Sequence, residues 1–386
     1  MIRKIIAAGF VLSCSVGAVE AQICPSYPNT LTNGQPADVS QVMANFSSIR
    51  DCVNGKLREV VTANRSYYVR TDGSDSNNGL ANTPGGAFLT IQKGINTVAN
   101  SIDLGGFNVT IQVANGTYTQ ALALRPLTGS GLATISGDTT TPSNVLLSVT
   151  GGNVINGNSF GSGWQVQGVK FTTTTSGHGI NISGSSALTI SGKVDFGALA
   201  SGYTHMIPLD GARILVNAGY TISGSAGGHV LASRAAGIAM PGISITLNSV
   251  PVFQYFAAAQ GTSAVSASVI TFQDQNGKTR QTAAGNTHSN TTLDGLTINT
   301  NLLSNGMIVT GSGILAGTTI SIVNSSTVTL SQAATTTVAG GTVKFEIARG
   351  TKFINATAGG TDTNGAGLDY FPGDAAGSAP SPGWYN

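Results

Sequence analysis

The chain has 386 residues, and only 9% of them are charged, against roughly a quarter in typical globular domains. Helices in water normally carry charged faces, so this composition argues against a helical protein. The formal net charge is +2 and no basic block is present, which removes the electrostatic basis for nucleic-acid binding. Apolar residues make up 40% of the chain, enough to fill a core, and abundant Gly, Val, Thr, Ser and Asn favour strands and tight turns.

The N-terminus has the pattern of a secretory signal peptide. Arg3 and Lys4 precede an apolar run over residues 5–12, and small residues then predict a cleavage that removes residues 1–21. The apolar run is shorter than the about 20 residues that cross a bilayer, so we expect no membrane span. A lipoprotein signal ending at Cys14 is the minor alternative. The prediction is a secreted, extracellular protein.

Two cysteines, Cys24 and Cys52, remain after removal of the signal peptide. In an oxidising compartment, two cysteines that bracket one short region predict a single structural disulfide. Two unpaired thiols are the alternative.

Residues 22–62 are predicted to form an N-terminal helical segment. Asp38 is placed to cap a helix, and apolar residues recur after it at helical spacing. These residues are Val39, Val42, Met43, Phe46, Ile49, Val53 and Leu57. Such a row must be buried against something, and a docking partner, a trimer axis and the body of the protein itself remain open as its cover.

A second helix is predicted over residues 90–99, where Ile91, Ile95 and Val98 recur at helical spacing. The residues before it, 72–79, are rich in Asp, Asn, Ser and Gly. They do not have the Glu that closes an EF-hand calcium loop, so we expect a hydrogen-bonded loop without a metal ion.

From residue 108 onward, short strand-forming runs recur between Gly, Asn and Ser, and no segment between them is a good helix. An α/β fold would need such helices, and a β-sandwich would not need the helix at 90–99. A parallel β-helix fits both observations, because its first coil exposes apolar core and unpaired backbone unless something covers it. We therefore predict an all-β protein, a right-handed parallel β-helix over residues 63–285, with 90–99 as its capping helix. The runs lie at 109–113, 133–135, 145–149, 164–171, 179–182, 187–190, 214–216, 220–222, 229–231, 243–247 and 269–272.

Three blocks of sequence carry a resemblance to a known family. Residues 68–75 (YVRTDGSD), 88–93 (FLTIQK) and 109–118 (VTIQVANGTY) resemble the start of right-handed β-helix proteins of the pectin-lyase-like superfamily. Residues 31–46 and 367–377 are similar to segments of phage tailspike and tail-fibre proteins. The resemblance implies a spike-like or fibre-like protein, a homotrimer, and a location in a virion tail if a phage encodes it. The signal peptide favours a bacterial secreted or prophage-derived relative.

Residues 286–347 interrupt the rhythm of the strands. They resemble a small all-β module that recurs in phage tail and bacterial surface proteins, and 343–347 is predicted to rejoin the main body. We therefore predict an inserted β-module over 286–347, followed by a terminal coil and C-terminal tail over 348–386. A binding surface and a spacer or trimer contact are the alternatives for its role.

The sequence offers few residues that could form a catalytic or metal-binding site. The weak catalytic candidates are Asp195 and Asp210, which could lie on neighbouring coils. Nearby in sequence are His205, Arg213, His229 and Arg234, which complete the best catalytic grouping that the chain offers. Paired carboxylates of this kind hydrolyse glycosidic bonds, but single Asp residues in turns more often bond the backbone. The four histidines show no metal-binding spacing and no phosphate loop is present, so we expect no metal and no cofactor.

Binding requires less of the sequence than catalysis does. Carbohydrate recognition can use aromatic faces with side-chain amides and hydroxyls, and the candidate aromatics are Trp164, Tyr203, Tyr220, Tyr255 and Phe256. For each of them, burial in the core is the alternative. We therefore expect a non-catalytic protein that binds a surface polysaccharide or cell-surface glycan. A polysaccharide depolymerase of the same fold and a purely structural stalk are the rival hypotheses.

Overall fold

The computed structural model describes residues 28–32, 36, 38–248, 251–268 and 270–347, with the pairs 349–350, 353–354, 361–362 and 365–366. The chain divides into two units, residues 1–58 and 59–386. The predicted signal peptide, 1–21, lies outside the described residues, as does the end of the chain after residue 366.

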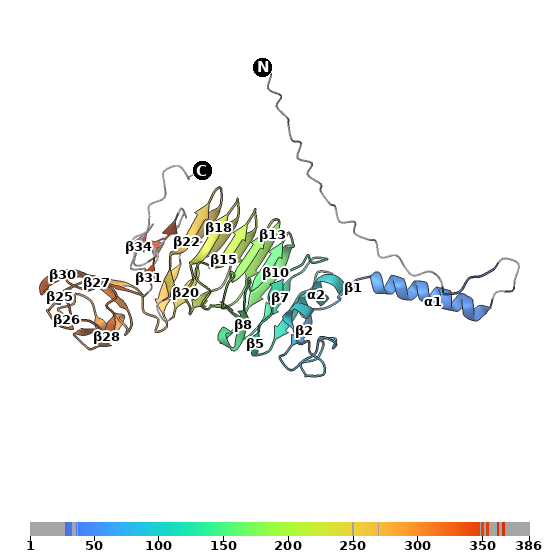
Figure 1. Ribbon diagram of the computed structural model, residues 1–386, viewed down its shortest axis with the longest axis horizontal. Helices are drawn as coiled ribbons and strands as arrows, with labels where there is room; N and C mark the ends of the chain where they lie inside the picture. The colour runs from blue at the N-terminus through green and yellow to red at the C-terminus, as the bar shows by residue number, and fades with distance from the viewer. Residues whose placement is uncertain are drawn as a thin grey trace, which may run out of the picture. The chain divides into compact units, whose positions relative to one another are not determined.

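The first unit contains helix α1 (Val39–Lys56) (Figure 1). Asp38 caps it as predicted, since its Oδ1 accepts a hydrogen bond from the Ser40 amide at 2.8 Å. Asn45 fixes the segment before α1, because its side chain hydrogen-bonds to both the amide and the carbonyl of Asn29. The apolar row of α1 is largely exposed, with Phe46 at 61%. The described part of this unit therefore does not cover the row.

The second unit is a parallel β-helix built from three sheets, which confirms the predicted fold class (Figure 1). The chain visits the first, second and third sheets in turn, and each strand pairs in parallel with the strand one coil away. The coil repeat is close to 25 residues: Lys170 pairs with Asp195, and Asp195 with Thr221.

The strands of each sheet follow one another along the stack. The first sheet holds β2 (Arg65–Val69), β4 (Val109–Val113), β7 (Ala133–Ser136), β10 (Gly161–Gln167), β13 (Ser186–Ile190), β16 (Arg213–Val216), β19 (Gly237–Pro241) and β23 (Ala264–Ser268). The second holds β5 (Gly116–Tyr118), β8 (Val145–Val149), β11 (Lys170–Thr173), β14 (Asp195–Phe196), β17 (Tyr220–Ile222), β20 (Ser244–Leu247) and β24 (Thr271–Asp274). The third holds β6 (Leu122–Ala123), β9 (Ile155–Asn158), β12 (Ile180–Ser183), β15 (Thr204–Leu209), β18 (Gly228–Ser233), β22 (Tyr255–Gln260) and β32 (Phe353–Ile354).

The core consists of columns of like side chains stacked through the coils. Strands alternate inward apolar and outward polar residues, as in β4, where every second residue is buried. In-register pairing then places each inward residue on the next one. One such column contains Ile111, Ile135, Val166, Ile190 and Val216, all nearly inaccessible to solvent.

A second column lies at the turn from the third sheet to the first. Five successive coils place a residue of positive φ there: Ser159 (49°), Gly184 (64°), Asp210 (53°), Arg234 (57°) and Gly261 (67°). The pairing registers Asn158–Ser183, Ser183–Leu209 and Leu209–Ser233 stack these turns. The same left-handed bend is thus repeated along one edge, even where a residue other than Gly must adopt it.

Helix α2 (Ile91–Ser101) lies over the first coil, as predicted for residues 90–99. The Thr90 hydroxyl caps it by accepting a hydrogen bond from the Lys93 amide at 3.2 Å. Its apolar face is buried, and the helix approaches so closely that a Cβ on Gly94 would lie 2.9 Å from the Ile111 side chain. The helix therefore shields the end of the stack.

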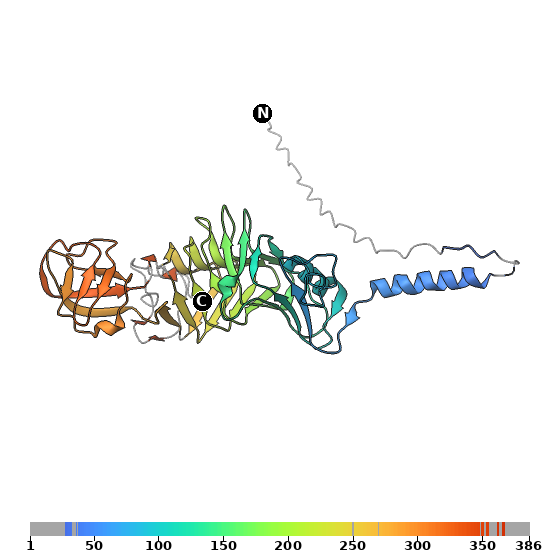
Figure 2. The same ribbon diagram turned by 90° about the horizontal axis from the view of Figure 1, so that it is seen from below.

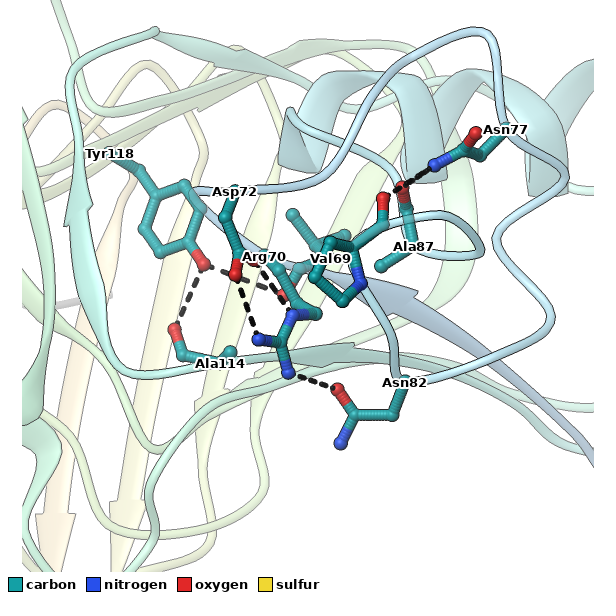
Figure 3. A network of polar contacts seen from close by, with 9 residues as sticks. Val69, Arg70, Asp72, Asn77, Asn82, Ala87, Ala114 and Tyr118 are labelled. Atoms are coloured by element: carbon teal, nitrogen blue, oxygen red, sulfur yellow. Dashed lines mark hydrogen bonds and ion pairs between the residues drawn. The ribbon is translucent and has the colours of Figure 1, made fainter.

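The loop between β2 and α2 is held by hydrogen bonds, as predicted for 72–79. Asp75 accepts the amides of Leu89 and Thr90, each at 2.9 Å, and so positions the start of α2. Figure 3 shows the neighbouring network, in which Arg70 bonds both Asp72 and Asn82. In the same view the hydroxyl of Tyr118 donates to the Ala114 carbonyl at 2.9 Å.

Several short strands and turns lie outside the three sheets. β1 (Glu59–Val60) pairs with β3 (Ile102–Asp103), and β21 (Val252–Phe253) with β31 (Arg349–Gly350). The 3-10 turns are η1 (Pro142–Asn144) and η2 (Thr300–Leu302), and a last hairpin joins β33 (Thr361–Asp362) to β34 (Gly365–Ala366).

After β24 the chain forms a separate antiparallel sheet before β31 and β32 pair with coil strands again. The prediction that 343–347 rejoins the main body is wrong, because residues 343–346 lie in a strand of this sheet. Its strands are β25 (Gln281–Thr287), β26 (Thr292–Asp294), β27 (Ile308–Gly311), β28 (Ile320–Val323), β29 (Val328–Leu330) and β30 (Val338–Glu346). The two outer strands meet, since the Val309 amide donates to the Thr318 carbonyl and the Ile320 amide to the Met307 carbonyl. The sheet thus closes on itself, and Figure 2 shows its orange strands wrapped around one another.

The capping role of α2 predicts a large stability cost for truncating its buried face. Ile95 is fully buried, so Ile95→Ala should lower the free energy of unfolding by about 2–5 kcal/mol. Asn100→Ala, on the exposed side of α2, should change it by less than about 0.5 kcal/mol. Denaturant unfolding followed by circular dichroism measures both variants. Equal losses in the two would contradict the capping role.

Candidate functional site

A groove of about 360 Å³ lies where the chain passes from the second sheet to the third. It is formed by three successive loops: the one after β14, the one after β17, and the segment that leads into β22. Its lining residues are Leu199, Ser201, Gly202, Ser225, Ala226, Gly227, Val252, Phe253 and Gln254.

The loops stack on one another through backbone contacts. The Leu199 amide donates to the Ser225 carbonyl at 3.0 Å, and the Ala226 amide to the Val252 carbonyl at 3.2 Å. A Cβ on Gly227 would lie 2.7 Å from backbone atoms of Gly202, so glycine is required where these loops meet. The groove is therefore a rigid continuation of the coil stack.

Two tyrosines directly follow groove-lining residues in the chain, Tyr203 after Gly202 and Tyr255 after Gln254. Tyr203 and Tyr255 are both partly exposed, and Tyr203 makes an edge-to-face contact with His178 at 5.2 Å. Thr204 connects His178 with Tyr255. Its amide donates to His178 Nδ1 at 3.0 Å, and its hydroxyl bonds the Tyr255 hydroxyl at 2.9 Å. Burial lowers the pKa of His178, so its imidazole is neutral.

Glycine makes room for one of these rings. A Cβ on Gly228 would lie 2.1 Å from the ring of Tyr255, so the ring lies directly across that backbone position. Tyr203 and Tyr255 are the two predicted binding aromatics that remain accessible. Trp164, Tyr220 and Phe256 are buried, so the expectation that they bind a ligand is wrong and the core alternative holds for them.

An ion pair lies beside the groove on the outer face of the second sheet. Lys170 Nζ is 3.1 Å from Asp195 Oδ2 and donates to the Ser223 hydroxyl at 2.7 Å. That hydroxyl in turn donates to Asp195 Oδ2 at 2.9 Å. Asp195 is only 6% exposed; Lys170 and Ser223 both contact its Oδ2, whereas its buried Oδ1 has no hydrogen-bond partner among the described residues.

The second catalytic candidate, Asp210, lies elsewhere on the same turn of chain. It belongs to the left-handed column between β15 and β16, where it accepts hydrogen bonds from Arg234 at 2.5 and 3.0 Å. The Arg234 guanidinium lowers the pKa of the Asp210 carboxyl. Asp195 and Asp210 therefore lie in different parts of the coil, and each is paired with a cation from the neighbouring coil.

The residues predicted near these carboxylates are also placed apart. Arg213 is exposed on the outer face of the first sheet, whereas His205 and His229 are fully buried inside the coils. The predicted grouping of Asp195 and Asp210 with these four side chains is thus wrong, apart from the contact of Asp210 with Arg234. In a β-helix, sequence neighbours separate because outward and inward positions alternate and each coil has three corners.

The buried histidines form a directed hydrogen-bond chain with Tyr220. The Tyr220 hydroxyl is 2.7 Å from His229 Nε2, the Nδ1 atoms of His229 and His205 are 3.0 Å apart, and His205 Nε2 is 2.8 Å from the Gly197 carbonyl. Since a carbonyl only accepts, His205 carries its proton on Nε2 and His229 on Nδ1. This assignment holds for neutral imidazoles, and burial keeps them neutral because it lowers the pKa of both histidines.

Cys52 is disulfide-bonded, while Cys24 lies outside the described residues. The pairing of Cys24 with Cys52 therefore stays a prediction.

Sequence reasoning missed the partners of Asp195 and the groove itself. The signal was the coil repeat: Lys170 precedes Asp195 by one coil, and Asp210 precedes Arg234 by one coil. Aligning the strands on that repeat would have found both ion pairs. The groove has no comparable signal, because its lining mixes small, apolar and amide side chains from three loops that share no sequence motif.

Comparison with known proteins, and the described residues outside the groove, give three further findings. No family model, curated protein or solved structure matches the chain. Within the described residues, no three or more His, Cys, Asp and Glu side chains gather into a group able to hold a metal ion. Among the described helices, none has the length and apolar character needed to cross a membrane.

The buried histidine chain predicts acid sensitivity. Burial lowers the pKa of His205 from 6.5 to about 4 and that of His229 well below its usual value. Between about pH 6.5 and 4 these histidines bind protons in the unfolded chain but not in the folded chain. Their contribution to the free energy of unfolding is therefore fully present above about pH 6.5 and is lost as the pH drops toward 4. The slope should reach about 1.4 kcal/mol per pH unit for each histidine. Denaturant unfolding at several pH values should show about half of this slope lost in His229→Asn, and an unchanged slope would contradict it.

Proposed function

We propose that this protein is a secreted, spike-like or fibre-like β-helix protein that binds a surface polysaccharide or cell-surface glycan without cleaving it. The observation that carries the proposal is the groove on the stacked loops, with the partly exposed Tyr203 and Tyr255 adjacent in the chain to its lining residues Gly202 and Gln254. Sugar rings present apolar C–H faces that pack on aromatic rings, and hydroxyl groups that bond to hydroxyls and amides. Ser201, Ser225 and Gln254 supply such groups in the groove.

The rigidity of the stack supports this role. Each groove loop is fixed by hydrogen bonds to the loops of adjacent coils, so little ordering is needed when a ligand binds. A repeated polymer suits a surface that itself repeats with each coil. A groove that is already formed is typical of ligand sites.

The ion pairs favour binding over hydrolysis. A glycosidase needs one carboxyl group to donate a proton and another to act as base or nucleophile across the scissile bond. Asp195 and Asp210 lie in different parts of the coil, and each is occupied by a basic partner. A depolymerase remains the alternative, and it would be supported if Asp195→Asn or Asp210→Asn abolished cleavage of a purified polysaccharide. A stalk without ligands would show no binding on a glycan array.

We also propose that the chain assembles as a homotrimer through α1. Val39, Val42, Phe46, Ile49 and Val53 alternate at spacings of three and four residues, which is the pattern of a coiled-coil seam. Much of this row is exposed in the first unit. Equivalent helices from other copies would bury it.

Truncation of Tyr203 or Tyr255 should weaken glycan binding. A well-packed aromatic contact contributes about 2 kcal/mol, so Tyr203→Ala or Tyr255→Ala should raise the Kd about 30-fold. Tyr68→Ala is the matched control, since Tyr68 is a partly exposed tyrosine on the first sheet. A glycan array with wild-type protein identifies a bound polysaccharide, and calorimetry with it then compares the variants. Equal affinity in all of them would exclude the groove as the site.

The assembly proposal is tested by mass in solution. Wild-type protein should have three times the chain mass by light scattering, and Phe46→Asp should yield monomers because a charge enters the seam. Ala44→Asp places the same charge on the opposite side of α1 and should leave the trimer intact. A monomeric wild-type protein would remove the proposal.

A further inference from the structure

We propose that Lys170 and Asp195 condense into an isopeptide bond, a side-chain amide that joins two neighbouring coils of the stack. The cross-link is a covalent modification of the protein and is independent of the proposed glycan binding. Four features of the pair support it: the strand register, the space around the lysine stem, the burial of the carboxylate and a hydroxyl group that bridges the two.

The strand register holds the two reacting groups together. β11 and β14 are parallel neighbours, and Lys170 pairs in register with Asp195. The next pair of residues, Phe171 and Phe196, stacks inside the core with ring centroids 5.3 Å apart. Because side chains alternate along a strand, Lys170 and Asp195 lie side by side on the outward side, with Nζ 3.1 Å from Oδ2. Groups held in contact react far faster than free molecules do.

The lysine stem lies in a space that a glycine leaves open. A Cβ on Gly197 would lie 2.7 Å from Lys170 Cε and 2.5 Å from the Thr172 side chain. The stem therefore passes over the backbone that follows Asp195, and a larger residue at position 197 would displace it. This fit directs the amine at the carboxylate.

Burial favours a neutral product over the ion pair. The Asp195 side chain is 8% exposed, whereas Asp72 and Asp210, which pair with arginines, are 55% and 49% exposed. Oδ1 of Asp195 is buried without a hydrogen-bond partner among the described residues. A buried ion pair loses the hydration of both charges. An amide at this position carries no charge, since Oδ1 becomes its carbonyl oxygen and Oδ2 leaves as water.

The Ser223 hydroxyl bridges the two groups and can carry a proton between them. It accepts a hydrogen bond from Lys170 Nζ at 2.7 Å and donates one to Asp195 Oδ2 at 2.9 Å. As the ammonium gives a proton to Ser223 Oγ, the hydroxyl gives its own proton to Oδ2. The result is a neutral amine in contact with a carboxylic acid, and Ser223 is left unchanged.

The amide forms from this neutral pair by loss of water. The Nζ lone pair attacks Asp195 Cγ, so that the Nζ–Cγ bond forms and the Cγ–Oδ2 bond breaks. Oδ2 leaves with the proton received from Ser223 and one more proton from Nζ. One ammonium and one carboxylate thus give one amide and one water molecule, and nothing is oxidised or reduced. Arg234 beside Asp210 has no such route, because a guanidinium stays protonated.

Peptide mapping tests the cross-link directly. Trypsin cleaves after free lysine and arginine, so unlinked protein, digested after denaturation, should release residues 171–193 and 194–213 as separate peptides. In linked protein Lys170 is acylated and is not cleaved, so 194–213 should stay joined to the peptide that contains Lys170. The mass of the joined species should be one water molecule below the sum of its two parts. We expect it to be the major form of wild-type protein, and recovery of only the free peptides would overturn the proposal.

Matched variants connect the loss of water to this pair. Lys170→Arg keeps the positive charge but should abolish the link, whereas Lys193→Arg makes the same change nearby in the chain and should leave the link intact. A loss of water that persists in Lys170→Arg would contradict the proposal. Circular dichroism confirms that each variant is folded.

Two substitutions of Ser223 test the proton relay. Ser223→Ala should slow the appearance of the linked species in freshly prepared protein about 100-fold, because general acid–base catalysis typically contributes at least that much. Ser223→Thr retains a hydroxyl and should link at a rate close to that of the wild-type protein. Equal rates in all three proteins would contradict the relay, since a hydroxyl with only a structural role would not change the rate.

Discussion

The structure depends on one constraint, the in-register parallel pairing of each strand with its equivalent one coil away. Pairing of this kind fixes which residue of one coil lies on which residue of the next. Ile111 therefore stacks on Ile135, and Lys170 lies beside Asp195. Apolar columns then fill the interior because strands alternate inward and outward residues. The same pairing also repeats one backbone conformation at the turn in successive coils. Ser159, Asp210 and Arg234 adopt there the positive φ that Gly184 adopts without steric cost.

Stacking also determines how the few charged and polar groups are used. Asp195 and Asp210 each meet a cation from an adjacent coil, and the result is a surface with paired charges instead of free ones. Inside the stack, His205, His229 and Tyr220 satisfy one another and end on the Gly197 carbonyl. Because Gly197 begins the loop that leads to the groove, the buried chain and the groove share one backbone support.

Much of the fold could be predicted from local pattern. The alternation in VTIQV (109–113) and the apolar spacing in residues 90–99 depend only on neighbours in the sequence, and both elements lie where expected. The candidate site was predictable only in part. Tyr203 and Tyr255 are accessible as a binding role requires, but Trp164, Tyr220 and Phe256 are buried, and an aromatic residue in a strand gives no local sign of which face it occupies.

The sequence by itself determined the class of architecture, the capping helix and the scarcity of charge, because each depends on residue type and short-range periodicity. Only the tertiary structure decided that Lys170 neutralises Asp195, that Asp210 pairs with Arg234, and that three successive loops form a groove. These features join residues one or two coils apart, and their positions depend on the register of the whole stack. Register is a property of the assembled sheets, since a shift of one residue would exchange the inward and outward side chains of a strand.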